Sequence, residues 1–104
     1  MNKGIVVFVT VPCEKASELA RTILKEKVAA CVNIIPGVES LFWWEGKIDE
    51  AKESLLLIKT QTQLFDRVLA VIKENHPYTV PEIVAVEMDK VYPEYLRWIC
   101  EVAR

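Results

Sequence analysis

One short loop combines the side chains of this chain that are best suited to chemistry. It contains the only histidine, His76, followed by the phenol of Tyr78 and the carboxylate of Glu82. Pro77 and Pro81 each fix a backbone φ angle and push the preceding residue toward extended geometry, so the loop is expected to be stiff. A stiff loop can hold these polar groups in a fixed relation. The same residues also allow a purely structural interpretation, in which the prolines end a helix and begin a strand while the histidine caps or packs.

Three residues have the side-chain types that bind copper or zinc, namely Cys31, His76 and Glu82. Such a site needs thiolate, imidazole and further ligands within about 2.0 to 2.3 Å of the ion. The sequence does not say whether they converge, and each has an alternative role. Cys31 could instead serve as a small buried hydrophobic residue in a strand. His76 could be a hydrogen-bond partner within the loop, and Glu82 could form an ion pair with Lys59 or with a cation of another subunit.

Catalysis has little support in the sequence, so we expect no catalytic residues and no enzymatic activity. No Ser-His-Asp pattern, GxSxG or HExxH motif occurs. Cys31 and His76 are a conceivable nucleophile and base, but a buried strand cysteine would lack access to a substrate. The three glycines are isolated, so no phosphate-binding loop is present. Lys59, at the end of a predicted strand, is either solvated or meets an anionic ligand.

Length and composition indicate a single soluble domain over residues 1–104. Hydrophobic residues make up 52% of the chain and charged residues 27%, which is typical of a folded globular protein. Thirteen basic residues are offset by fifteen acidic ones, giving a net charge of -2, so nucleic acid is not an expected partner. No apolar run is long enough to cross a membrane. Three scattered cysteines without CxxC spacing argue against disulfides and structural zinc, and we expect a cytoplasmic protein.

The first half of the chain predicts a strand, a helix and a long hairpin. Residues 4–11 are a β-branched run expected to be a strand buried on both faces. An amphipathic helix follows, because apolar residues recur at helical spacing at Ala16, Leu19, Ala20, Ile23, Leu24 and Val28. Strand character at 29–35 is interrupted by Pro36 and Gly37, as at a bulge, and resumes at 38–44. Glu45 and Gly46 then form a hairpin turn before a return strand over 47–60.

The tip of this hairpin is expected to project beyond the body of the domain. The first half of its return strand, residues 47–53, is charged, whereas residues 54–58 are apolar enough to be buried. The tip carries Phe42, Trp43 and Trp44, and projecting aromatic side chains invite another subunit or a ligand. The alternative, that all three cover the core of their own domain, stays open.

The second half predicts a helix, a strand and a final helix. Thr62 is a suitable N-cap for a helix that ends at Asn75 and whose apolar face comprises Leu64, Phe65, Val68, Val71 and Ile72. Residues 82–87 form a fourth strand, and Pro93 opens a helix with Tyr95, Trp98, Ile99 and Val102 on one side. This βαββαβ order followed by an extra C-terminal helix predicts an α+β, ferredoxin-like fold, a split antiparallel sheet with two helices on one face.

Five motifs in order resemble the CutA family of divalent-cation tolerance proteins. They are residues 29–33 (AACVN), 42–48 (FWWEGKI), 59–60 (KT), 76–83 (HPYTVPEI) and 95–98 (YLRW). Any one would be weak evidence, but together they span nearly the whole chain and are highly specific. Cys13 and Cys100 lie outside these motifs, so no metal role is transferred to them.

The resemblance implies a tight homotrimer whose hairpin strands add to neighbouring sheets. It also implies tolerance to copper and other divalent cations, reported copper binding and, in animal relatives, a proposed link to anchoring acetylcholinesterase. It places the candidate metal ligands Cys31, His76 and Glu82, together with Lys59, Tyr78, Trp43 and Trp44, in or beside clefts between subunits. We expect Lys59, Tyr78 and Trp43 to contact a ligand, and Phe42 and Trp44 to form the subunit interface.

Three functions are compatible with this pattern. The first is a non-enzymatic trimer that requires no cofactor and binds a divalent metal, copper before others, in its intersubunit clefts as part of a response to metal ions. The second is a signalling trimer that senses a small anionic metabolite in the same clefts. The third is a scaffold for an unknown protein partner, in which the clefts are incidental. The second rests on analogy between folds and is discounted accordingly.

Overall fold

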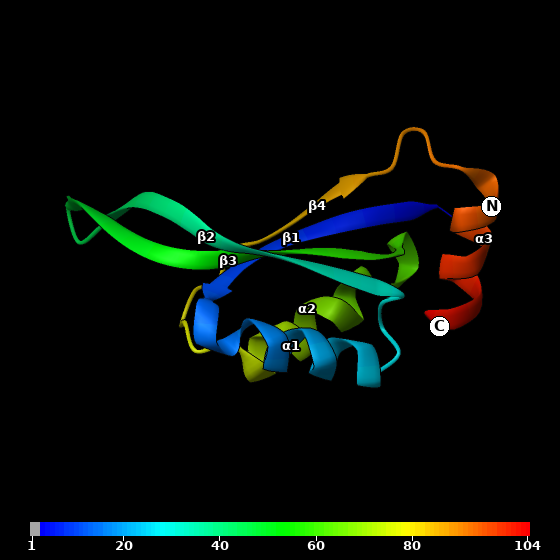
Figure 1. Cartoon of the computed structure of the whole chain (residues 1–104), viewed down its shortest axis with the longest axis horizontal. Coiled ribbons are helices and arrows are strands. Elements are labelled where there is room, and N and C mark those ends of the chain that lie inside the picture. The colour runs from blue at the N-terminus through cyan, green and yellow to red at the C-terminus, as the bar shows by residue number, and fades with distance from the viewer. Residues whose placement is uncertain (1–2) are drawn as a thin grey trace.

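The chain folds into one sheet, with helices α1 and α2 beneath it and helix α3 at one end (Figure 1). The computed structural model describes residues 3–104. Its elements in chain order are β1 (Gly4–Pro12), α1 (Cys13–Lys25), β2 (Cys31–Trp44), β3 (Lys47–Gln61), a short 3-10 helix (Thr62–Leu64), α2 (Phe65–Asn75), β4 (Ile83–Glu87) and α3 (Pro93–Val102).

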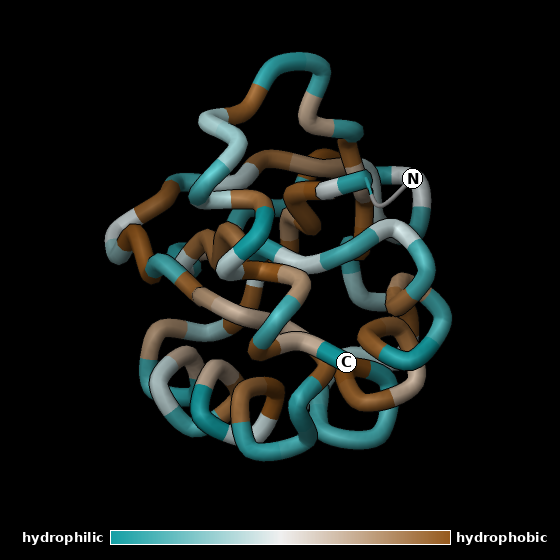
Figure 2. Tube along the Cα trace, turned by 90° about the vertical axis from the view of Figure 1, so that its right-hand side faces the viewer, coloured by the Kyte–Doolittle hydropathy of each residue, from teal (hydrophilic) through white to brown (hydrophobic). Residues whose placement is uncertain are grey.

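The sheet has four antiparallel strands in the order β2-β3-β1-β4. Helices α1 and α2 lie on one face of it, and α3 lies at the end opposite the hairpin tip (Figure 1). This is the ferredoxin-like α+β architecture expected from the order of elements, with its additional C-terminal helix. Figure 2 shows that hydrophobic and hydrophilic positions alternate along the chain instead of separating into long blocks, as expected when each element buries one side only.

The core lies between the helices and one face of β1 and β3. Alternate residues of β1 point to this face and are fully or almost fully buried, and they pack with β3 and both helices in one cluster that includes Val7, Val9, Leu56, Ile58, Leu19, Ile23, Val68 and Ile72. The intervening residues of β1, among them Val6 and Phe8, are only partly buried. The expectation that β1 is buried on both faces is therefore wrong for the single chain, because no helix covers the second face.

We call this second face the open face; it comprises Val6 and Phe8 of β1, Leu55 and Leu57 of β3, and Val84 and Val86 of β4. The pairings Phe8 with Leu57 and Phe8 with Val84 place these side chains on the same side of the sheet. Val84 and Val86 are exposed. The open face is thus an apolar surface that its own chain covers only in part.

Helix α1 confirms most of the predicted apolar stripe but ends earlier than the stripe suggests. Ala16, Leu19, Ala20 and Ile23 are buried on it, whereas Leu24 is exposed. Val28 is also buried but lies beyond the helix. Lys27, with a φ of 64°, adopts the left-handed conformation that turns the chain toward β2.

The hairpin of β2 and β3 extends as an arm, which we define as residues 38–53. Its base is marked by the predicted bulge, where the register shifts between Ile35 and Val38 and Gly37 has a φ of 73°. At its tip, Glu45 and Gly46 both have positive φ angles of 49° and 76°, as a two-residue hairpin turn requires. The arm accounts for the long dimension of the molecule, which measures 44 × 26 × 22 Å.

Thr62 does not cap α2, as the sequence suggested. It begins the short 3-10 helix, and its hydroxyl donates to the carbonyl of Lys3 at 3.3 Å. Helix α2 itself starts three residues later, at Phe65, and no side chain caps it. The 3-10 turn inserts between β3 and α2, so the hydroxyl that would cap the helix is used to tie the start of β1 to the end of β3.

The burial of Ile58 predicts a graded loss of stability. Ile58 is fully buried in the core, so Ile58→Val should lower the free energy of unfolding by about 0.5 to 1.5 kcal/mol and Ile58→Ala by about 2 to 5 kcal/mol. Urea denaturation at a fixed protein concentration measures both. Equal, near-zero losses would contradict the placement of Ile58 in the core.

Candidate functional site

His76 is held by hydrogen bonds at both ring nitrogens. The backbone N–H of Tyr78 donates to its Nδ1 at 3.1 Å, so the hydrogen of the neutral ring lies on Nε2 and is donated to the carbonyl of Thr10 at 2.8 Å. The pairing of β1 with β4 ends at Val9, and the imidazole bonds to β1 just beyond it. His76 is 9% exposed. In the single chain, His76 therefore has the structural role of a hydrogen-bond partner that holds the loop. Neither ring nitrogen keeps a lone pair for a metal.

Tyr78 connects the same loop to the base of the arm. Its hydroxyl donates to Oε2 of Glu53 at 2.7 Å. Burial, followed by the hydrogen bond and the negative charge of Glu53, raises the pKa of Tyr78 to about 12. Glu53 is only 4% exposed, although the sequence placed it in the charged half of its strand. It pairs with Val38 in the register of the arm, and the phenol is its hydrogen-bond donor.

The predicted metal ligands Cys31, His76 and Glu82 do not converge within one chain. Cys31 pairs with Lys59, which pairs with Val6, whereas His76 bonds to Thr10. Val6 and Thr10 are four residues apart on β1, which corresponds to roughly 13 Å. Glu82 precedes β4 and is exposed. Throughout residues 3–104, no group of three or more His, Cys, Asp and Glu side chains is arranged to hold a metal.

A second polar cluster surrounds Cys31 and Lys59, which are direct partners in β2 and β3. Both lie on the side of the sheet that carries the open face, because Lys59 also pairs with Val6. Nζ of Lys59 donates to Oδ1 of Asn33, and Sγ of Cys31 lies 3.9 Å from the same oxygen. Burial, followed by the influence of Cys31, raises the pKa of Tyr95. The cluster thus sets a thiol, an amide and an ammonium group at the edge of an apolar surface.

The three aromatic residues of the arm divide between its two faces. Phe42 pairs with Asp49 and Trp44 with Lys47, on the same side as Glu53, whereas Trp43 pairs with Ile48 on the opposite side. Trp43 is 74% exposed. All three aromatics are exposed, which excludes the alternative that they cover the core of their own domain.

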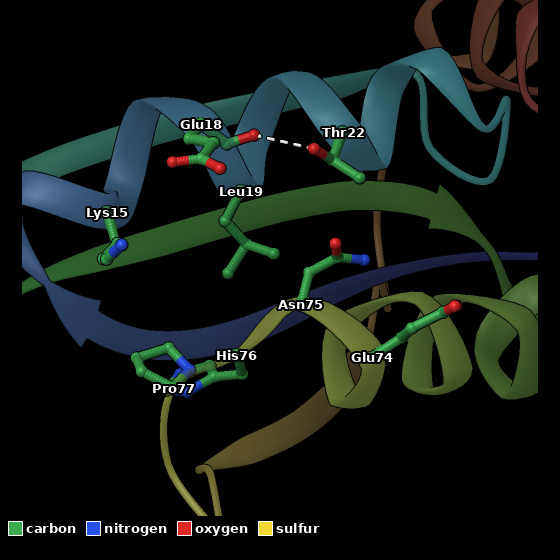
Figure 3. Close-up of a pocket in the computed structure, with 8 residues that line it drawn as sticks. All are labelled: Lys15, Glu18, Leu19, Thr22, Glu74, Asn75, His76 and Pro77. Atoms are coloured by element: carbon green, nitrogen blue, oxygen red, sulfur yellow. Dashed lines mark hydrogen bonds between the residues drawn. The ribbon is translucent and has the colours of Figure 1, made fainter.

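A cavity of about 220 Å³ opens on the helical side of the loop. Figure 3 shows side chains of α1 on one side of it, and on the other the end of α2 with the residues that follow. Its lining is Lys15, Glu18, Leu19, Thr22, Glu74, Asn75, His76 and Pro77. The imidazole therefore sits between this cavity and the backbone of β1.

Sequence reasoning missed Glu53, Asn33 and Tyr95. Strand alternation could have found Glu53, since it lies an even number of residues from Lys59 and so on the same face of β3. Asn33 likewise follows Cys31 by two positions. Tyr95 carried no such signal, because its approach to Cys31 depends on how α3 packs at the end of the sheet.

A further thiol, Cys13, stands at the start of α1 and is exposed. Hydrogen bonding with the Ser54 side chain, and then with the Gly37 backbone, lowers the pKa of the Cys13 thiol. All three cysteines are free. Helices of sufficient length and hydrophobicity to cross a membrane are not found in residues 3–104.

The fold and the sequence together define the class of protein. The family model for the CutA1 divalent ion tolerance protein matches residues 5–102. This chain therefore belongs to the CutA1 family, as the five sequence motifs indicated.

Relatives and solved structures agree with this assignment. Over 92% of its own length, this chain is 49% identical to protein CutA 1, chloroplastic, of Oryza sativa, and the match spans 55% of that plant protein. This chain is 46% identical to the divalent-cation tolerance protein CutA of Thermus thermophilus, of which it spans 94%. The crystal structure of CutA1 from Oryza sativa superposes with a TM-score of 0.95 at 47% identity, covering 98% of this chain and 94% of that one. The chain thus spans about half of the plant protein and nearly all of the bacterial one.

The bond between Tyr78 and Glu53 predicts how stability depends on alkaline pH. The pKa of Tyr78 is raised above its ordinary value of 10.0, so the folded state disfavours the phenolate, and this stabilisation is present below pH 10 and lost as the pH rises toward 12. Tyr78→Phe should abolish this part of the pH dependence, measured by chemical denaturation between pH 8 and about pH 11.

A neutral-pH comparison tests the same contact. Tyr78→Phe leaves the buried Glu53 carboxylate without its phenolic donor, at an expected cost of about 1 to 3 kcal/mol. Glu53→Gln is the matched control, because its amide oxygen still accepts from the phenol, and it should cost less. The reverse order would mean that the hydrogen bond contributes little.

Proposed function

We propose that this protein is a homotrimer that binds divalent metal ions, copper before others, in clefts between its subunits. The observation that carries the proposal is the position of Cys31 and Lys59 on the side of the sheet where an apolar surface is left uncovered. An apolar surface of this kind favours burial against another copy. Burying it would enclose the thiol of Cys31 between subunits.

The ligand set proposed for the metal follows from what the single chain leaves available. Cys31 offers sulfur, and Glu82 offers an exposed carboxylate on the loop at the other end of β1. Ligands contributed by two subunits can build a site that one chain lacks. His76 is left out, because both of its ring nitrogens are already bonded. Its role here is to position the loop that carries Tyr78 and Glu82.

A copper titration tests this function. Calorimetric titration of the tag-free protein with Cu(II) should give saturable heats near about one ion per subunit. Cys31→Ser should weaken binding by about tenfold or more, since serine is a poor ligand for a soft metal. Cys100→Ser is the matched control, because it removes a thiol outside the cluster and should leave the affinity unchanged. Heats that never saturate, or that both variants affect equally, would refute the site.

The second candidate ligand is a small anionic metabolite. It is favoured by the ammonium group of Lys59, which faces the same side of the sheet and is held by Asn33. In this case a thermal-shift screen of carboxylates and phosphates would show stabilisation that Lys59→Gln removes and that added metal leaves unaltered.

The trimer is tested through the two faces of the arm. Trp44 lies on the same side as the open face and Trp43 on the opposite side, so Trp44→Arg should lower the molar mass measured by light scattering. Trp43→Arg adds the same charge at the neighbouring position and should leave the mass unchanged. A full trimer mass in Trp44→Arg would show that this aromatic residue is not essential to the interface.

We further propose a cytoplasmic protein without enzymatic activity. Three free cysteines, one of them exposed, favour a reducing compartment. The polar clusters hold His76 and Tyr78 in hydrogen bonds to other groups of the chain, which favours a structural role over proton transfer to a substrate. A scaffold for a partner protein would instead be indicated by capture of that partner without any response to metal.

A further inference from the structure

We propose that His76 makes the loop of residues 76–82 responsive to pH, docked when the imidazole is neutral and released when it is protonated. The proposal rests on the hydrogen bonds and burial of this residue. It is tested on the protein without added metal, so its outcome does not depend on whether Glu82 of the same loop binds a metal.

The hydrogen bonds of His76 fit the neutral ring and exclude the charged one. Nδ1 accepts from the backbone N–H of Tyr78 at 3.1 Å, and Nε2 donates to the carbonyl of Thr10 at 2.8 Å. A protonated imidazole has two donors and no acceptor. Protonation would therefore set an N–H group against the N–H of Tyr78, and this amide would lose the acceptor that it has in the neutral state. The hydrogen bond from Nε2 to Thr10 would persist, so the contact that is lost is the one to Tyr78 within the loop.

The cavity beside the loop gives a proton a route to the ring. His76 forms part of its lining together with charged side chains from both helices, namely Lys15 and Glu18 of α1 and Glu74 of α2 (Figure 3). The two carboxylates would favour a positive ring and Lys15 would oppose it. From the strands, β1 presents the uncharged carbonyl of Thr10, and β3 presents Glu53, whose charge reaches the loop through the Tyr78 phenol.

The stiffness of the loop carries the change from His76 to Tyr78. Pro77 lies between them and its φ angle is fixed, so the peptide that joins Pro77 to Tyr78 has fewer ways to turn, and a displacement of this peptide shifts the Tyr78 side chain. That side chain holds the bond to Glu53 at the base of the arm. The pKa of Tyr78 is raised to about 12, so the phenol stays a donor throughout the range in which histidine titrates, and the imidazole is the group that senses pH.

The experiment follows the ring and the loop together by NMR on the full chain. Because His76 is the only histidine, its ring resonance, followed between about pH 5 and 8 where an imidazole can change charge, reports on this residue alone. The protection of the Tyr78 amide against hydrogen exchange, corrected for intrinsic exchange, should fall about tenfold or more across the same titration, as expected when a bonded donor loses its acceptor. The two midpoints should coincide.

Two variants separate the effect of the His76 imidazole from that of a nearby carboxylate. His76→Gln keeps a polar group that stays uncharged, and the protection of the Tyr78 amide should then be independent of pH. Glu53→Gln removes the nearest carboxylate on β3, and the pH dependence should remain. The proposal is overturned if the imidazole does not titrate in this range, if the midpoints differ, or if Glu53→Gln abolishes the effect. Should His76→Gln not fold, the coincidence of midpoints in the unmodified protein decides.

Discussion

The pairing of β1 with β3 is the constraint on which the rest of the structure depends. It runs without interruption from Gly4 opposite Gln61 to Pro12 opposite Glu53. Because side chains alternate along a strand, this register decides the side of the sheet for every residue of both strands. Val7 and Ile58 are buried between the sheet and the helices. Lys59 lies one position further along β3, so its side chain faces the opposite side of the sheet.

The same alternation explains why an apolar surface and a polar cluster share one side of the sheet. The two helices cover only the side that carries Val7 and Leu56, so Phe8 and Leu57 are only partly buried and Val84 is exposed. Cys31 joins them through its pairing with Lys59. A subunit of this size buries a limited share of its surface, and assembly through the uncovered side would add apolar burial while enclosing the thiol. Stability and ligand binding would then depend on the same contact between subunits.

Much of the fold was predictable, because strands, helices and turns leave patterns in neighbouring residues of the sequence. The apolar stripe of α1, the bulge at Gly37 and the turn at Gly46 were all visible in the sequence, and the structure confirms them. The site was less predictable because it is made of long-range contacts. The approach of Tyr78 to Glu53 joins residues 25 apart in sequence, and that of His76 to Thr10 joins residues 66 apart. Neither follows from periodicity, and composition alone misjudged Glu53 as a solvent-facing charge.

The loop from His76 to Glu82 links the two layers that the sheet otherwise separates. At its start the imidazole lies beside the cavity between α1 and the end of α2, and two residues later the phenol of Tyr78 reaches Glu53, on the other side of the sheet. Prolines at 77 and 81 remove much of the freedom that would otherwise absorb a displacement between these points. A change in the hydrogen bonding of His76 would therefore reach the base of the arm through the bond between Tyr78 and Glu53.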